Sequence, residues 1–535
     1  MTDYIVIGAG SAGAIIAARL SEDANANVVL IEAGGRDSSF LYHMPAGYLG
    51  LVKAGMGNWC YETVPQPGLN GRTMYFPRGK VLGGSSSINA LVFVRGNAGD
   101  FDGWAESGAQ GWSYRECLPY FKKLESFEKG EDPYRGGNGP IGVSAGPPIE
   151  DMSDLGQAVI RAGIEAGYRI NPDYNGATQE GFGSANSNIA NGRRQSTAST
   201  YLAQAAGRPN FRIISSAHVT RILFEKGRAV GVEYISKKKL HRLDTGGEII
   251  LSGGAVHSPQ LLQLSGVGPA ALLRAAGVDV VVDLPGVGEN LQDHLTVNLQ
   301  QEITKPWSEL GKMKPLNTIK ALAQYALFTS GPTTSNGQEI LAFLKSDNAL
   351  AEPDIQFHFP KIMVQDHGRI IIKREGITAV ANFSRPRSRG TVRISSADPR
   401  QAPVIDPKYF SDPEDIRITR EAIRMGRDIF AQPAFDDLRG PEFAPGEQVQ
   451  SDEDLDQYIR DTIYSGYHAC GTCKMGVDEL AVVDPTTLKV RGIDGLRVAD
   501  ASIMPAIVSG NTNAASMMIG EKAADLIKGI SPAMS

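Results

Sequence analysis

Residues 4–13 read YIVIGAGSAG, in which a β-branched apolar run meets three glycines spaced as G-x-G-x-x-G. The run at residues 4–7 is typical of a strand that is buried on both faces. A helix-compatible stretch follows at residues 14–21, and a second apolar run follows at residues 27–31. This order predicts the strand–helix–strand unit of a doubly wound parallel sheet.

Each of three glycines and one carboxylate in this unit has a distinct structural role in binding a dinucleotide. Gly8 permits the tight turn, Gly10 lets backbone N–H groups approach a pyrophosphate, and Gly13 lets the helix pack against the strand. Glu32 lies 19 residues after Gly13, where a carboxylate can accept hydrogen bonds from ribose hydroxyls. A glycine-rich turn without a ligand would leave this acid unexplained. We therefore predict a dinucleotide site, which the motif alone does not assign to NAD or to FAD.

The composition is that of an ordinary globular protein. The chain has 535 residues, of which 42% are hydrophobic and 21% are charged, and this excludes a disordered chain. The net charge of −6 provides no basic footprint for nucleic acid. One hydrophobic core serves ~100–200 residues, so we expect two domains or one domain with a large insertion. Only four cysteines, no signal-peptide pattern and no apolar run of ~18–20 residues together predict a cytoplasmic protein.

A second dense glycine pattern occurs at residues 77–89, which read PRGKVLGGSSSIN. Glycines followed by small hydroxyl residues can form a concavity lined with N–H groups, which suits an anion or the edge of a polar ring. Arg78 and Lys80 add positive charge to this loop. An ordinary glycine–serine turn explains the same residues equally well when they are taken alone.

Four separated motifs together resemble one family, the glucose–methanol–choline (GMC) oxidoreductases. Residues 79–89 are similar to the first signature of that family, and residues 254–268 (GAVHSPQLLQLSGVG) are similar to the second. Residues 385–390 and a C-terminal block from Tyr467 to about residue 527 also resemble family members. Within the family, the chain looks nearest to the choline-dehydrogenase-like group, which includes bacterial polyethylene glycol, sorbose and alcohol dehydrogenases.

The resemblance implies FAD as the cofactor and a fold of α/β plus α+β class. A Rossmann-like FAD-binding domain would comprise residues 1–155, 200–300 and 460–535. A substrate-binding domain, built on an antiparallel sheet covered by helices, would comprise residues 156–199 and 301–459.

The same resemblance implies which residues hold the flavin. Some relatives attach FAD covalently through a histidine at the position of Ile88, and isoleucine cannot form that bond, so we expect non-covalent FAD. We expect no metal. The expected FAD-binding residues are Gly8, Gly10, Ser11, Ala12, Gly13, Glu32, Ala33, Trp59, Arg78, Val81, Gly83, Gly84, Ser85, Asn89, Val92, Val219, Asp500, Ala501, Asn511 and Thr512.

His468 and Asn511 are the expected catalytic residues. His468 matches the active-site histidine of the family, and Asn511, 43 residues later, matches a partner position that is His or Asn among relatives. Oxidation of an alcohol requires removal of the hydroxyl proton and transfer of a hydride from carbon to flavin N5. An imidazole with a reference pKa of ~6.5 can accept that proton near neutral pH, while an amide can hold the substrate oxygen without titrating.

The predicted reaction is FAD-dependent oxidation of a small-molecule alcohol to the aldehyde or ketone, with the electrons passed to a quinone or another non-oxygen acceptor. An oxidase that makes hydrogen peroxide from oxygen would use the same residues. A non-redox family member, such as a lyase or photodecarboxylase, is a third alternative, against which the intact pair of His468 and Asn511 argues. These residues identify neither the alcohol nor the oligomeric state.

The C-terminal block also predicts local structure. A strand ends at Asp500, and the residues at 511–513 (NTN) precede an apolar-periodic stretch at 514–527, as a helix N-cap does. Cys470 and Cys473 form C-x-x-C, a spacing that can bind zinc or form a redox pair, but no second pair of ligands is evident. We favour the interpretation that Cys470 and Cys473 are packing residues that neither bind a metal nor form a redox pair.

Three further segments have structural interpretations. Residues 47–71, rich in Gly and Pro, suit a loop that covers the flavin. Residues 353–359 alternate like a strand, and we favour core packing over a pocket wall for its two phenylalanines and His358. Residues 305–328 form a basic amphipathic segment, which we expect as a helix packed on the substrate domain. The alternative for this segment is peripheral contact with the inner face of the cytoplasmic membrane.

Overall fold

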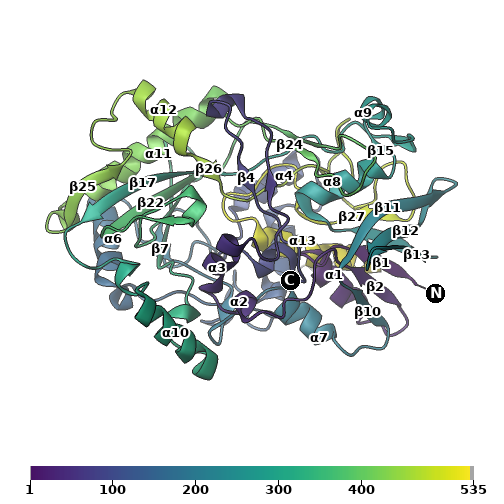
Figure 1. Cartoon of the computed structure of the whole chain (residues 1–535), viewed down its shortest axis with the longest axis horizontal. Helices are drawn as coiled ribbons and strands as arrows, with labels where there is room; N and C mark the ends of the chain where they lie inside the picture. The colour runs from purple at the N-terminus through teal and green to yellow at the C-terminus, as the bar shows by residue number, and fades with distance from the viewer. Residues whose placement is uncertain (1, 531–535) are drawn as a thin grey trace.

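The computed structural model describes residues 2–530 and contains two large β-sheets (Figure 1). The first is a parallel sheet of five strands in the order β10-β2-β1-β14-β27. Helix α1 (Gly13–Leu20) leads from β1 to β2, and α13 (Asn513–Lys528) packs against α1. This arrangement confirms the predicted strand–helix–strand unit. The strands are β1 Tyr4–Ile7, β2 Val28–Ile31, β10 Phe211–Ile214, β14 Glu248–Leu251 and β27 Leu496–Val498.

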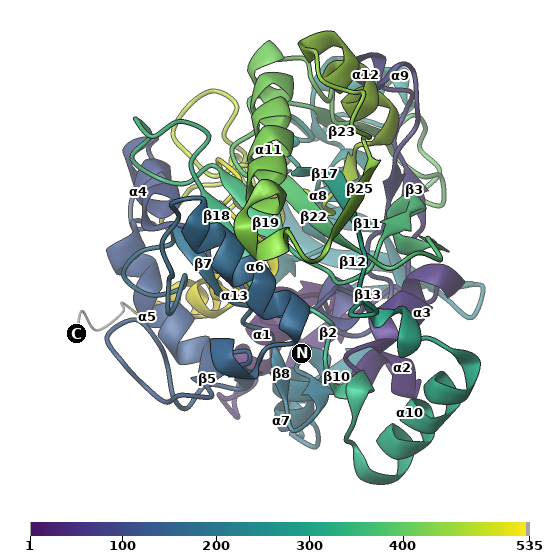
Figure 2. The ribbon, with the colours of Figure 1, turned by 90° about the vertical axis from the view of Figure 1, so that its left-hand side faces the viewer.

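The second sheet is antiparallel and lies in the other half of the molecule. Its strands follow the order β25-β17-β22-β19-β18-β7, and β26 also pairs with β17. The long helix α11 (Pro413–Ala431) packs on β22 and β17 and contacts α6 (Asp154–Glu165), so helices cover this sheet as predicted (Figure 2). The strands are β7 Gly181–Ser184, β17 Leu295–Ile303, β18 Ile340–Leu344, β19 Ile355–His358, β22 Gly376–Phe383, β25 Arg439–Ala444 and β26 Tyr464–Ser465.

Smaller elements surround the two sheets. A three-stranded sheet in the order β11-β12-β13 extends beside the parallel sheet. Its strands are β11 Ala217–Glu225, β12 Arg228–Ser236 and β13 Lys239–Asp244. The remaining helices are α2 Phe40–His43, α3 Gly47–Ala54, α4 Ala98–Glu106, α5 Tyr114–Leu124, α7 Ala203–Ala205, α8 Gly254–Leu264, α9 Ala270–Ala275, α10 Pro315–Phe328 and α12 Asp452–Thr462.

Two clusters of buried apolar side chains correspond to the two large sheets. One cluster includes Val6 and Leu251 of the parallel sheet, and the other includes Phe357 and Phe359 of the antiparallel sheet. The predicted core packing of these two phenylalanines is therefore confirmed. Strand β17 runs across residue 300, where we placed a domain boundary, and the division of the chain into two domains stays a prediction.

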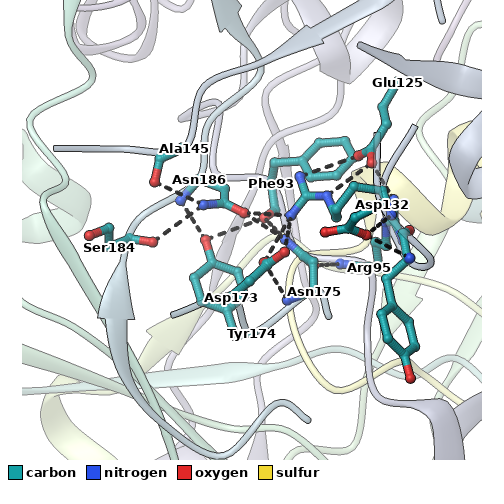
Figure 3. A network of polar contacts seen from close by, with 12 residues as sticks. Phe93, Arg95, Glu125, Asp132, Ala145, Asp173, Tyr174, Asn175, Ser184 and Asn186 are labelled. Carbon is teal, nitrogen blue, oxygen red and sulfur yellow. Dashed lines mark hydrogen bonds and ion pairs between the residues drawn. The ribbon is translucent and has the colours of Figure 1, made fainter. Parts of the chain in front are cut away.

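A buried ion-pair network, shown from close by in Figure 3, joins segments that are distant in the sequence. The guanidinium groups of Arg95 and Arg135 both pair with the carboxylate of Glu125, and all three side chains are fully buried. Arg135 also donates to Asp173, at 2.9 Å, and to Asn186, at 3.0 Å. The network thus links β5 (Glu125–Phe127) to the residues that flank β7.

Two segments differ from their predicted structure. Residues 47–71 do not form a continuous loop, because they begin with the helix α3, which ends where Gly55 adopts a left-handed φ of 60°. The predicted helix in residues 305–328 is present as α10, but Tyr325 is its only buried residue. The expectation that its apolar side chains pack on the substrate domain is therefore wrong. None of the helices within residues 2–530 combines the length and the hydropathy of a membrane span.

Candidate active site

A cavity of about 370 Å³ opens at the carboxyl ends of β1, β2 and β14, the edge at which parallel sheets bind their ligands. His468 lines this cavity. Three of the expected FAD-binding residues, Gly13, Val81 and Gly83, do not line it. Those that do are Gly8, Gly10, Ser11, Ala12, Glu32, Ala33, Trp59, Arg78, Gly84, Ser85, Asn89, Val92, Val219, Asp500, Ala501, Asn511 and Thr512.

The three residues that do not reach the cavity have packing roles instead. A Cβ at Gly13 would lie 2.0 Å from the carbonyl oxygen of Gly8, so this glycine lets α1 approach the turn, as the sequence predicted. A Cβ at Gly83 would lie 2.2 Å from Oγ of Ser87. Val81 is buried in a small apolar cluster with Tyr42 and Leu51.

The glycine turn has the shape that a dinucleotide requires. Gly8 adopts a φ of +97°, and a Cβ there would lie 2.4 Å from the carbonyl oxygen of Ser252, so only glycine fits. At Gly10, by contrast, a Cβ would meet nothing within 4 Å. This open space faces the cavity at the point where we expect a pyrophosphate to approach the backbone.

Two buried carboxylates border the cavity. Glu32 accepts hydrogen bonds from the backbone N–H groups of Ala9, at 2.9 Å, and Gly34, at 2.8 Å. Burial raises the pKa of Glu32 to about 7, against the effect of these two donors. Asp500 accepts from the backbone N–H of Gly254 and the hydroxyl of Ser258, and burial raises its pKa as well.

These features fit FAD. The open space at Gly10 suits the pyrophosphate, and each oxygen of Glu32 keeps a lone pair for a ribose hydroxyl, because each accepts only one backbone bond. Trp59 supplies an aromatic face on the same cavity, with its ring centroid 4.3 Å from that of His257.

A chain of hydrogen bonds runs through His468 and fixes which of its nitrogens is basic. Nε2 of His468 lies 3.0 Å from Nδ2 of Asn511, and Nδ1 lies 2.9 Å from Nδ1 of His294. Nε2 of His294 lies 2.9 Å from the carbonyl oxygen of Ser384. Because a carbonyl only accepts, His294 carries its proton on Nε2, and its Nδ1 accepts the Nδ1–H of His468. Nε2 of His468 is therefore unprotonated, and its electron pair accepts a hydrogen bond from Nδ2 of Asn511.

Burial keeps His468 neutral. Desolvation, with smaller contributions from His294, Arg78 and His358, holds the pKa of His468 well below its usual range. Its backbone N–H donates to Asp293 at 2.8 Å, and this buried carboxylate also accepts from the hydroxyl of Tyr409 at 2.7 Å. The imidazole is thus held in place by its main chain and is available as a proton acceptor at neutral pH.

Asn511 is oriented from its other side by the antiparallel sheet. Nε2 of Gln356, on β19, donates to Oδ1 of Asn511 at 3.1 Å. The amide nitrogen of Asn511 therefore points to His468, and no side-chain capping bond forms at Thr512, the residue before α13. The predicted side-chain N-cap is therefore absent: Thr512, at the N-cap position, has helical φ and ψ of −82° and −5°, and the side chain of Asn511 bonds to His468 instead.

The sequence did not indicate three residues of this arrangement. His294 and Asp293 precede β17 in a stretch without a recognisable motif. Gln356 lies on the polar side of an alternating strand, and this alternation was the only available signal. His358, on the same strand, is buried and does not line the cavity, and burial lowers its pKa to about 4.

Cys470 and Cys473 are both free and fully buried. Both belong to the apolar cluster of the parallel sheet, and burial raises the pKa of each thiol. This supports the interpretation that they pack rather than react.

Comparison with known proteins identifies relatives along the whole chain. The family described as GMC oxidoreductase matches twice, over residues 2–296 and residues 386–520. The oxygen-dependent choline dehydrogenase of Sinorhizobium fredii is 46% identical over 99% of this chain and 96% of its own length. The mitochondrial choline dehydrogenase of Mus musculus is 46% identical over 98% of this chain and 89% of its own length.

Solved structures share the fold. A pyridoxine 4-oxidase, given as from Mesorbium loti, superposes with a TM-score of 0.89 at 31% identity over 98% of both chains. A formate oxidase from Aspergillus oryzae RIB40 superposes with a TM-score of 0.92 at 28% identity, over 99% of this chain and 98% of the other.

Proposed function

Because the chain belongs to the GMC oxidoreductase family, FAD-dependent enzymes that act on CH–OH donors, we propose that it is an alcohol dehydrogenase in which His468 is the base. The observation that carries this proposal is the hydrogen-bonded pair of His468 and Asn511 on the wall of the cavity. FAD, when bound, supplies the hydride acceptor. The residues that would hold it are those of the glycine turn, Glu32, Asp500 and the loop at residues 77–89.

The chain's own residues position the alcohol and accept its proton. Nε2 of His468 is unprotonated, so it accepts the hydroxyl proton of the alcohol once the alcohol replaces Asn511 as its hydrogen-bond partner. Nδ2 of Asn511, whose Oδ1 is held by Gln356, donates to the substrate oxygen. Holding both partners in a defined geometry can lower the barrier by several kcal/mol, up to roughly 7–11.

The charges around the cavity favour a neutral alcohol. Among residues 2–530, the carboxylates that line it are Glu32 and Asp500, and both accept hydrogen bonds from the backbone of the predicted dinucleotide site. The guanidinium of Arg78 also lines the cavity, where it donates to the carbonyl of Tyr467. A quaternary ammonium group would therefore meet a positive charge and no available anion.

Choline is the second candidate substrate, because two relatives that are 46% identical are named choline dehydrogenases. The rings of Trp59 and Tyr467 line the cavity, and aromatic faces can bind quaternary ammonium groups. A choline-like substrate would be held by aromatic rings of this kind, without a carboxylate opposite its charge.

The acceptor is the third part of the proposal. We propose that electrons leave to a quinone or another non-oxygen acceptor, with oxygen as the alternative, and that FAD is bound without a covalent bond at Ile88. The pair of His468 and Asn511 argues against a lyase or photodecarboxylase.

A matched pair of substrates tests the proposal. Choline and 3,3-dimethylbutan-1-ol have the same shape and differ in charge. We expect anaerobic bleaching of the flavin spectrum by the neutral alcohol at a higher kcat/KM than by choline. Faster bleaching by choline would reject the neutral substrate, and no bleaching by any primary alcohol would reject alcohol oxidation. When air is admitted, slow recovery of the spectrum identifies a dehydrogenase, whereas fast recovery identifies an oxidase.

A further inference from the structure

We propose that the helix α10 attaches this protein to the surface of an anionic lipid bilayer. The helix projects from the body of the molecule in both views, on the side of α2 and α3 (Figures 1 and 2). This inference is independent of the reaction proposed above.

The apolar side chains of α10 point away from the protein. Leu316 and Ile319 are each 64% exposed, Leu327 is 74% exposed and Phe328 is 73% exposed. A surface helix of a globular protein normally turns its apolar side inward. Here that pattern is reversed, which indicates a partner for the outer face.

The outer face is a continuous stripe. At 3.6 residues per turn, Leu316, Ile319, Ala323 and Leu327 fall within an arc of about 80°. Tyr325, the buried residue of the helix, lies roughly opposite Leu316, at about 180°. The helix therefore has one side toward the protein and a separate apolar side toward solvent.

The charges around this stripe select an anionic surface. Lys312, Lys314 and Lys320 are exposed, and the sequence contains no Asp or Glu between Glu309 and Glu339. Lys312 pairs with Glu309 at 2.9 Å, whereas the described ion pairs include none for Lys314 or Lys320. Lysines beside an exposed apolar stripe are the composition of helices that lie in the interface of anionic membranes.

The neighbouring elements extend the apolar surface toward the cavity. Phe40, on α2, is 56% exposed, and Leu49, on α3, is 44% exposed. The backbone N–H of Ala46, which precedes α3, donates to the carbonyl of Thr333 just beyond α10. Because α3 also lines the cavity through Tyr48 and Leu51, docking of α10 would bring this wall of the cavity close to the bilayer.

Co-sedimentation of the FAD-loaded protein with vesicles tests the proposal. We expect binding to vesicles of equimolar phosphatidylglycerol and phosphatidylcholine, and much weaker binding to vesicles of phosphatidylcholine alone. Combining Lys312→Gln, Lys314→Gln and Lys320→Gln should weaken binding by about tenfold or more. Combining Leu316→Gln, Ile319→Gln and Leu327→Gln should abolish it, because the buried apolar area is lost.

A matched control separates this site from general attraction of basic protein to anionic lipid. Lys237, Lys238 and Lys239 are also consecutive exposed lysines, in the turn after β12 and at the first residue of β13. Changing all three to Gln should leave vesicle binding unchanged. Equal loss in this control, or no binding by the wild type, would overturn the proposal. Light scattering after size-exclusion chromatography tests whether the stripe instead binds a second copy of the chain. In that case the wild type would be a dimer, the variant with Gln at 316, 319 and 327 would be a monomer, and neither would bind vesicles. That result would overturn the proposal.

Discussion

The Nδ1 atoms of His294 and His468 lie 2.9 Å apart, and the far side of His294 is anchored to the carbonyl of Ser384. This contact sets the proton arrangement of both rings. It leaves Nε2 of His468 unprotonated, as the acceptor that faces Asn511 on the wall of the cavity. His294 is therefore a positioning residue for the proposed base, although it does not line the cavity itself.

Changing His294→Ala should slow the oxidation and change its pH dependence. Without the acceptor at Nδ1, His468 can adopt the wrong tautomer, and we expect kcat to fall by about 10- to 100-fold, which is less than the roughly 10²–10⁴-fold that a general base contributes in full. His294 also lowers the pKa of His468, so its removal raises that pKa, and the acidic limb of the rate profile should move to higher pH. Rates of flavin reduction across pH measure both effects. The control is His241→Ala, which changes an exposed histidine on β13. If the pH–rate profile of His294→Ala coincides with that of the wild type, His294 does not position the proton of His468.

Gln356→Leu should weaken the alignment of Asn511. Loss of one hydrogen bond to the amide corresponds to about 0.5–1.5 kcal/mol, or roughly 2- to 13-fold in kcat/KM. FAD content should remain unchanged, since Gln356 does not line the cavity. Steady-state kinetics with the best alcohol provide the test, with the exposed Gln450→Leu as control. Full activity in Gln356→Leu would show that Asn511 needs no support from β19.

Glu32→Ala should reduce the retention of FAD. The carboxylate is the acceptor that we assign to the ribose, and it also holds the backbone N–H groups of Ala9 and Gly34. The ratio of flavin to protein absorbance after gel filtration measures the loss. Because burial raises the pKa of Glu32 to about 7, the wild type should also release FAD more readily as the pH falls below 7. If Glu32→Ala holds as much flavin as the wild type, both above and below pH ~7, Glu32 does not bind the cofactor.

Glu125→Gln should destabilise the protein without touching the cavity. The change removes the charge that Arg95 and Arg135 share in a fully buried position. Breaking a buried pair by removing one partner costs about 3–5 kcal/mol. We expect a lower melting temperature, measured by differential scanning calorimetry. Glu131→Gln, at an exposed pair with Lys122, should cost far less, and equal melting temperatures for the two variants would contradict the network's role.

The parts of the fold that could be predicted are those with local signals. The strand, glycine turn and helix at residues 4–21 follow from apolar periodicity and from the steric needs of three glycines, and the structure has them there. The match of most expected cofactor residues to one cavity has the same origin, because the motifs fix backbone shape.

The parts that could not be predicted depend on contacts between distant segments. His294 meets His468 across 174 positions of sequence, and Gln356 meets Asn511 across 155. A local sequence pattern carries no information about contacts between residues so far apart in the sequence. The outward face of α10 was only the alternative in the sequence analysis, since an apolar stripe in a sequence does not tell which side of the helix faces the protein.

The role of His468 as the base is tested most directly by the rate of flavin reduction by an alcohol in anaerobic mixing, for the wild type and for His468→Ala. The variant must first be shown to hold FAD in the same ratio as the wild type. We expect reduction that is about 10²–10⁴-fold slower in the variant, and a wild-type rate that stays constant from neutral pH down to pH ~6.5, since His468 is already neutral there. A variant that reduces its flavin at the wild-type rate would contradict the assignment of His468 as the base.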